Sequence, residues 1–288
     1  MKIEDLRNSA NFINKKIERS DTTNSQSSIF NLQLQGPMTK IGQYIYAIVA
    51  ADEERNFGAM GISGRSEEVF MVCYKDIGAV ISPSPIVKYP VTRANTMAHQ
   101  KVMEEAMKYY AMLPVRFGTI GEGDDLIREK VLKARYGEFK DLLGYMEDKI
   151  ELGLKALWTD MQAVYREIVD ENGDVRLFKQ RLMTKKIGLQ RDQQIQLGEM
   201  VKKALDTKRM REEKAILNLF KEFWVERKIN NTFGDQMVTN SAFLVQKDQE
   251  KEFDDKVGEL LRHYDGRMKL KYVGPIPPCN FVEISITW

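Results

Sequence analysis

The chain has 288 residues, enough for two domains of ordinary size, and its 44 basic residues nearly balance its 42 acidic residues to give a net charge of +2. This balance gives no overall field that would draw the protein to nucleic acid or to an anionic membrane. The hydrophobic fraction of 43% and the aromatic fraction of 9% are those of a globular protein, which excludes a chain that is disordered throughout.

The sequence carries no signal for a membrane or for secretion. Its longest apolar run, Tyr44 to Ala51, is far shorter than the ~20 residues that a membrane-spanning helix needs. The N-terminus has Glu4 and Asp5 without an apolar core behind them, unlike a secretory signal. The two cysteines, Cys73 and Cys279, are far apart and favour two half-buried thiols in a reducing compartment. We therefore expect a soluble cytoplasmic protein.

The N-terminal segment differs in composition from the rest of the chain. The stretch from Ser20 to Gln35 is dense in Ser, Thr, Asn and Gln and has few apolar residues to bury. We predict that residues 1–42 form a flexible extension. Two roles stay open for it: a partner orders this extension, or the extension is dispensable.

Residues 43–147 show the pattern of a first α+β domain. Three β-rich runs are followed by a helical face, a fourth run and a second helical pattern, which gives the order β-β-β-α-β-α. This order predicts a ferredoxin-like plan with helices on one face of an antiparallel sheet. The runs are Tyr44–Val49, Val69–Tyr74, Gly78–Ile81 and Leu113–Gly118, and the helical patterns are Ala98–Tyr109 and Ile127–Met146.

Residues 148–288 predict a second α+β domain with a long helical insertion. Strands are expected at Ile150–Trp158, Met237–Val245, Met268–Tyr272 and Val282–Ile286, and a helix is expected at Phe253–Tyr264. The stretch from Leu189 to Ile229 lacks proline and carries a helical stripe, so it predicts a long strut or a projecting helical hairpin. Basic residues outnumber acidic ones between Lys179 and Lys214, which is typical of a solvated helix face; an acidic partner or RNA stays open as an alternative.

The chain offers little for catalysis, metal binding or cofactor binding. Its two histidines, His99 and His263, lie in predicted amphipathic helices, where we expect them to be exposed, and neither has the spacing of a metal ligand. The glycines after Phe117 are followed by Glu122 and Asp124, which would repel a nucleotide phosphate. We therefore predict no enzyme activity, no cofactor and no metal site.

Two segments are better suited to binding another protein. Leu113–Thr119 (LPVRFGT) places an arginine and a phenylalanine beside a flexible glycine. Gly274–Phe281 (GPIPPCNF) predicts a rigid, polyproline-like corner between two strands, which would expose ring surface at low entropic cost; a purely structural corner is an equal alternative. The candidate partner-binding residues are Arg116, Phe117, Gly118, Pro275, Pro277, Pro278 and Phe281.

The same two segments resemble signatures of the gas vesicle GvpL/GvpF family. Leu113–Thr119 resembles its LPVRFGT motif and Gly274–Val282 its GPxPPYxFV ending, with Ile276 and Cys279 where the family favours aromatic residues. Tyr44–Val49 and Asn240–Val245 are similar to its opening strand and its NxAFLV strand. The four motifs occur in the family's order between Gln43 and Val282.

This resemblance implies an accessory protein of gas vesicle formation with two α+β domains, the first of them ferredoxin-like. It implies binding to the small hydrophobic shell protein and to other accessory proteins during assembly, a place in the cytoplasm or on the gas vesicle, and in some members a minor share of the finished vesicle. A ligand- or RNA-binding regulatory module on a ferredoxin-like fold is the alternative function. An enzyme on the same fold has only fold analogy in its favour.

Overall fold

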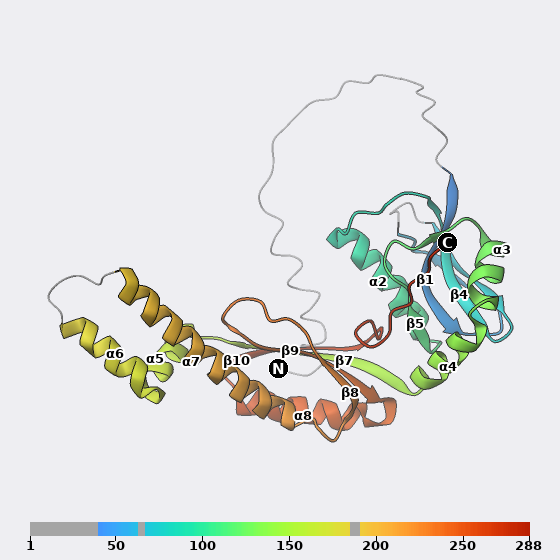
Figure 1. Cartoon of the computed structure of the whole chain (residues 1–288). Coiled ribbons are helices and arrows are strands. Elements are labelled where there is room, and N and C mark those ends of the chain that lie inside the picture. The colour runs from blue at the N-terminus through green and yellow to red at the C-terminus, as the bar shows by residue number, and fades with distance from the viewer. Residues whose placement is uncertain (1–39, 63–66, 185–190) are drawn as a thin grey trace, which may run out of the picture. The chain divides into compact units, whose positions relative to one another are not determined.

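The structure is a computed structural model that describes residues 40–62, 67–184 and 191–288 (Figure 1). The predicted flexible extension, residues 1–42, lies outside the described residues except for its last three. Of these three, Ile41 and Gly42 already belong to the first strand.

The contacts within the chain divide it into two compact units. The first unit contains the described residues up to Glu151 together with Pro275–Trp288, and the second unit contains Leu152–Gly274. The sequence placed residues 148–288 in one domain, whereas the contacts group the last residues with the first unit. Strand β7 (Lys149–Trp158) crosses the division.

The first unit is built on an antiparallel sheet with the strand order β2-β3-β4-β1-β5, and β6 also pairs with β1. The central strand β1 contains the β-branched and aromatic run that predicted it. A hairpin joins β3 to β4 at Lys75, whose φ of 54° is the left-handed conformation that such a tight turn needs. The strands are β1 (Ile41–Ala50), β2 (Asn56–Ala59), β3 (Glu68–Tyr74), β4 (Ile77–Pro85), β5 (Met112–Pro114) and β6 (Ile120–Gly121).

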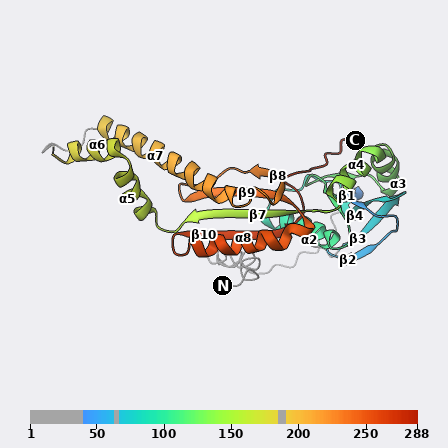
Figure 2. The same ribbon diagram turned by 90° about the horizontal axis from the view of Figure 1, so that it is seen from below.

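Helices cover both faces of this sheet, not one face as predicted. Every residue of β1 from Tyr44 to Val49 is buried, and because successive side chains point to opposite faces, both faces must be covered. Figures 1 and 2 show α2 on one side of the sheet and α3 to α4 on the other. The helices are α2 (Arg93–Met107), α3 (Asp124–Leu126), the π-helical segment η2 (Ile127–Lys133) and α4 (Tyr136–Met146).

The second unit has a four-stranded sheet with the order β10-β7-β9-β8. One face packs against α8 through a column of rings: the Phe253 ring lies 5.2 Å from Phe243 and 6.0 Å from Tyr272. The predicted helix face of α8 supplies its buried residues. The elements are β8 (Trp224–Ile229), β9 (Met237–Gln246), the short 3-10 helix η3 (Lys247–Gln249), α8 (Glu250–His263) and β10 (Met268–Ile276).

The helical insertion of the second unit consists of α5 (Met161–Glu171), α6 (Gly173–Thr184) and α7 (Arg191–Asn218). Figures 1 and 2 show α6 running beside the N-terminal half of α7. The stretch from Leu189 that predicted a strut or a hairpin contains one long helix, α7, so the strut alternative describes it better than a hairpin within that stretch. The helical stretch ends at Asn218, short of the predicted Ile229, because the chain turns there and continues as β8. Among the described residues no helix combines the length and the apolarity that crossing a bilayer requires.

The strand predicted at Val282–Ile286 is wrong. Only Ile284 pairs, in an isolated parallel bridge with Val115. Strand β10 continues through the predicted corner as far as Ile276, and the turn follows it. The alternation of Val282, Ile284 and Ile286 favours a strand, but only one residue of this stretch finds a partner edge.

Candidate functional site

The residues that carry the two signature segments meet in the first unit, above a pair of buried tyrosines. Tyr44 and Tyr46 of β1 lie on the same face of the sheet, with their ring centres 4.8 Å apart; β1 has an irregularity in its pairing at Tyr46. The Tyr46 hydroxyl is 2.8 Å from the Ser82 hydroxyl and accepts the backbone N–H of Ile62 at 2.9 Å. Both hydroxyls are thus buried with partners, as buried polar groups require.

His99 of α2 packs on these tyrosines and is buried, in contrast to the exposed position predicted for it. Its ring stacks on Tyr46 with ring centres 5.6 Å apart and meets the edge of Phe117 at the same distance. His99 Nδ1 lies 3.1 Å from the Tyr44 hydroxyl, and the ring also hydrogen-bonds the backbone of Val115. The helix that carries the histidine is thereby tied to the LPVRFGT segment.

Burial lowers the pKa of His99 to about 4, because the charged imidazolium would lose its hydration. The imidazole is therefore neutral at pH 7, with one nitrogen accepting and the other donating. Nδ1 then accepts from the Tyr44 hydroxyl, and the second ring nitrogen donates to the backbone of Val115. Burial also raises the pKa of Tyr44, so its hydroxyl keeps the proton that it donates.

The backbone of the loop after Val115 is fixed by hydrogen bonds, while part of the loop is exposed to solvent. The backbone N–H of Gly118 donates to the Tyr44 hydroxyl at 2.8 Å, and Gly118 has a φ of 84°, a left-handed conformation that favours glycine. Thr119 closes the turn by donating its hydroxyl to the Arg116 carbonyl at 2.7 Å. The Arg116 side chain is exposed, and Phe117 is half-buried. The turn therefore presents the arginine on a fixed backbone.

The C-terminal segment lies along the same loop. Ile284 donates its N–H to the Pro114 carbonyl at 2.8 Å and accepts the Arg116 N–H at 3.0 Å. Beyond it, the ring of Trp288 lies against Gly121, where a Cβ would stand 2.7 Å from the indole. The structure thus brings the LPVRFGT segment and the C-terminal residues together, although the sequence places them far apart.

The proline-rich corner is held in place by hydrogen bonds and does not expose the rings of Pro277 and Pro278. Pro277 and Pro278 are buried, in contrast to the exposed ring surface that we predicted. The fully buried carboxylate of Glu151 accepts the backbone N–H of Asn280 at 2.9 Å and its side-chain amide at 2.5 Å. This carboxylate therefore fixes the turn that leads the chain toward Ile284.

The predicted site residues thus fall into two groups. Arg116 and Gly118 are exposed, and Pro275, Phe117 and Phe281 are half-buried, so these five have accessible surface. Pro277 and Pro278 are buried and support the backbone of the turn.

Sequence reasoning missed His99 and Glu151 as supports. His99 lies on the same helical face as Val102 and Ala106, and Glu151 interrupts a buried apolar strand; each position was a signal of burial.

A second group of charged residues lies in the second unit. The Lys208 side chain is 4% exposed and pairs with Glu167 at 2.8 Å and Glu171 at 2.9 Å. Arg267 makes two hydrogen bonds with Glu167, at 2.6 and 2.9 Å, and one with Glu212 at 2.7 Å. The hydrogen bonds from Arg267 hold the pKa of Glu167 at about 2. Hydrogen bonds from Lys208 and Arg211 lower the pKa of Glu171 as well, so Glu167 and Glu171 stay ionised and paired, which suits a structural link better than acid–base chemistry.

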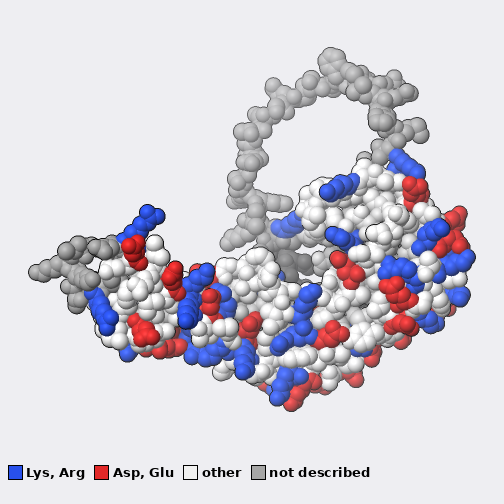
Figure 3. Space-filling view, in the orientation of Figure 1, with Lys and Arg blue, Asp and Glu red and all other residues white. Residues whose placement is uncertain are grey.

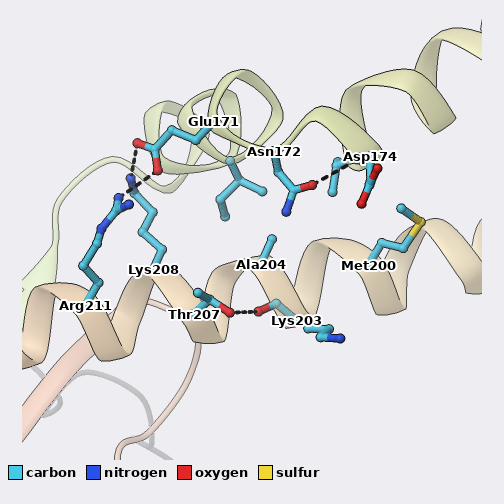
Figure 4. Close-up of a pocket in the computed structure, with 11 residues that line it drawn as sticks. Glu171, Asn172, Asp174, Met200, Lys203, Ala204, Thr207, Lys208 and Arg211 are labelled. Atoms are coloured by element: carbon cyan, nitrogen blue, oxygen red, sulfur yellow. Dashed lines mark hydrogen bonds and ion pairs between the residues drawn. The ribbon is translucent and has the colours of Figure 1, made fainter.

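Beside this network, a pocket of about 380 Å³ opens between α5, α6 and α7 (Figure 4). Figure 4 shows Lys208 and Arg211 reaching to Glu171 at one end of the pocket, and Met200 and Asp174 at the other end. The Thr207 hydroxyl donates a hydrogen bond to the Lys203 carbonyl at 2.9 Å, within α7 itself. Lys208 and Arg211 both pair with Glu171, so the charges at this end of the pocket are matched within the chain.

The remaining chemistry of the described residues is sparse. No group of three or more His, Cys, Asp or Glu side chains in the described ranges could hold a metal ion. Cys73 is half-buried, as predicted, whereas Cys279 is exposed, and both are free thiols. In Figure 3, acidic and basic side chains are interspersed over the visible face of the described residues. The LPVRFGT segment, together with the C-terminal residues that pair with it, is therefore the best candidate for a functional site.

Comparison with known proteins agrees with the four motifs. Residues 42–283 match the family described as gas vesicle synthesis protein GvpL/GvpF. Gas vesicle protein F of Nostoc sp. is 22% identical over 246 residues, which cover 85% of this chain and 99% of the relative. Gas vesicle protein F of a Streptomyces species is 27% identical over 241 residues, covering 83% of this chain and 99% of the relative.

A solved structure shares the fold. The crystal structure of the gas vesicle protein GvpF from Anabaena matches with a TM-score of 0.73 at 22% identity, covering 85% of this chain and 99% of that one. The match extends over nearly the whole of each relative, so it concerns the complete fold rather than one shared unit. The chain therefore belongs to the gas vesicle synthesis protein GvpL/GvpF family.

Proposed function

We propose that this chain acts in gas vesicle formation by binding the small hydrophobic shell protein, and other accessory proteins, during assembly in the cytoplasm. In this proposal the chain acts through binding rather than catalysis, and a place in the finished vesicle as a minor component stays open for it. Family membership supports a role in gas vesicle formation. The contact with the shell protein is the part that needs its own argument.

The main support is the way in which the LPVRFGT segment is held. The buried hydrogen bonds from Tyr44 and His99 fix its backbone, while the Arg116 side chain stays exposed. A loop that is already ordered loses little conformational entropy when a partner binds, and arginine is enriched among the residues that dominate binding energy. A rigid loop that presents an arginine therefore suits protein recognition.

An apolar patch near this loop supports a hydrophobic partner. Ile41 and Trp288 are more than half exposed, at 57% and 55%, and Val87 is nearly half exposed. Trp288 lies against Gly121, which pairs with Gln43 of β1. Ile41 stands two residues before Gln43 on β1, and Val87 follows two residues after Pro85, the β4 partner of Ile41. Apolar side chains grouped on a surface mark contact sites for proteins. We call Ile41, Val87 and Trp288 the apolar patch.

We further propose that the first unit is a ferredoxin-like domain. In it, β4, α2 and β5 form a split β-α-β unit, with β1 between the two outer strands. Two segments lie outside that plan: β2, and the C-terminal residues that pair at Ile284.

Co-expression with the gas vesicle shell protein, followed by pull-down and size-exclusion chromatography, tests the function. The native chain should give a stoichiometric complex that stays in solution. Arg116→Glu and Val87→Glu should each weaken this complex, because they place a carboxylate in the contact surface. Lys202→Glu, on the exposed face of α7, is the matched control and should bind like the native chain.

Two results would count against this function. One is a well-folded native chain, judged by circular dichroism, that forms no complex with the shell protein. The other is that Lys202→Glu weakens binding as strongly as Arg116→Glu does. The weaker binding would then come from the change in net charge and not from the position of Arg116.

A further inference from the structure

The second sheet carries lysines on the face opposite α8. Strand β10 alternates strictly: Met268, Leu270 and Tyr272 are buried, while Lys269 is exposed and Lys271 is partly exposed. The Tyr272 ring stacks with Phe253 of α8, so its face of the sheet is the one that α8 covers. Because successive side chains point to opposite faces, the two lysines point away from α8.

The register between β7 and β10 adds a third lysine to this face. A Cβ on Gly153 would lie 2.9 Å from the Val273 side chain, so these two residues are neighbours. Thr159, six residues after Gly153 and just past the end of β7, donates its N–H to the carbonyl of Arg267, six residues before Val273 and just ahead of β10. The two strands are therefore antiparallel without a net register shift between these points. Counting two residues from Gly153 and Val273 places Lys155 directly opposite Lys271.

This arrangement is unfavourable within the chain itself. Like charges directly opposite each other on a sheet destabilise it, since the Cβ atoms of such a pair are only about 5 Å apart. Lys155 is exposed, and in the part of the chain that the structure describes, none of Lys155, Lys269 and Lys271 forms a side-chain hydrogen bond or an ion pair. The repulsion is therefore not offset by an acidic neighbour.

We propose that Lys155, Lys269 and Lys271, the lysine face, bind an acidic segment of a partner protein. In an extended segment, carboxylates on alternate residues lie roughly 7 Å apart, which matches the spacing of Lys269 and Lys271 along β10. The residues next to the lysines on this face of the two strands, Gly153, Leu157 and Val273, are not aromatic, so these strands offer no ring beside the lysines on which single-stranded nucleic acid could stack. Charge complementarity therefore selects a carboxylate-rich peptide.

The lysine face is separate from the residues assigned to the shell protein, so its test does not depend on the proposed function. The probe is a synthetic peptide of alternating glutamate and valine, and its control is the same peptide with glutamine in place of glutamate. Binding to the full chain is measured by fluorescence anisotropy at low and at physiological salt. The glutamate peptide should bind and weaken with salt, and the glutamine peptide should not bind.

The double variant Lys155→Gln with Lys271→Gln should bind the glutamate peptide roughly tenfold more weakly. The control Lys202→Gln with Lys221→Gln changes the net charge equally in the same unit and should bind like the native chain. Equal binding by the two double variants would overturn the proposal. A single-stranded oligonucleotide that binds more tightly than the glutamate peptide, and is lost in the same variant, would also overturn it.

Stability measurements check the register independently of any ligand. Lys155→Gln and Lys271→Gln should each raise the urea midpoint of the second unit, because each removes the same repulsion. The double variant should then gain less than the sum of the two single gains. Strictly additive midpoints would show that the two ammonium groups do not face each other, and the geometric basis of the lysine face would be wrong.

Discussion

Replacing His99 with glutamine should change how the stability of the first unit depends on pH. The folded unit holds the imidazole neutral, with a pKa of about 4 against 6.5 in the unfolded chain. Between these two values the unfolded chain binds more protons than the folded one, so stability rises with pH. The contribution is complete above pH 6.5 and is lost as the pH falls from 6.5 to about 4. Glutamine keeps a hydrogen-bonding side chain but does not titrate.

The size of the effect follows from the two pKa values. A fall from 6.5 to about 4 corresponds to roughly 3 kcal/mol of unfolding free energy. The native chain should therefore lose roughly 3 kcal/mol more than the variant when the pH is lowered from 7.5 to 4. At pH 7.5 the variant itself should be less stable by about 1–2 kcal/mol, because glutamine replaces the ring stacked on Tyr46 and the bonds to Tyr44 and Val115 less well.

Hydrogen exchange followed by mass spectrometry suits this measurement, because it reports opening of β1 and α2 separately from the second unit. Opening free energies of these segments would be compared at pH 7.5, 6.0 and 4.5, with correction for the intrinsic exchange rate. His263→Gln is the matched control, since His263 is exposed on α8 and lies in the other unit. If native chain and His99→Gln lose the same stability between pH 7.5 and 4.5, the imidazole is not held neutral and the reasoning fails.

Three further substitutions probe the supports of the site. Glu151→Ala should lower the unfolding free energy by roughly 2–4 kcal/mol, because two partly buried donors of Asn280 lose their acceptor; a urea midpoint equal to that of the native chain would contradict the anchor. Gly118→Ala should cost about 1–2 kcal/mol in a thermal melt through the left-handed backbone alone, and an unchanged melt would show that the loop relaxes. Lys208→Met should cost roughly 1–2 kcal/mol, because the partly exposed carboxylates of Glu167 and Glu171 lose one of their cations; Lys202→Met, the exposed control on α7, should cost almost nothing, and equal losses would refute the network.

The local pattern of apolar residues was enough to predict the strands and helices whose apolar face is fully covered by another element. The apolar run of β1, the alternation of β10 and the stripe of α8 each appear in the structure, because each face has an element to cover it. The same reasoning failed for Val282–Ile286, whose alternation is just as regular. A strand needs a partner edge as well as a pattern, and only Ile284 finds one.

The sequence by itself determined the family, through four motifs in a fixed order, and with it the mixed helix and sheet content and a role in gas vesicle formation. Tertiary structure decided which residues support the LPVRFGT segment. His99 is buried because α2 lies against Tyr44 and Tyr46, and Glu151 clamps Asn280 across 129 positions of the chain. Such pairings depend on the path of the backbone between distant residues. Hydrophobic periodicity indicates only which face of a single helix or strand is buried, so it cannot predict which distant residues pair with each other.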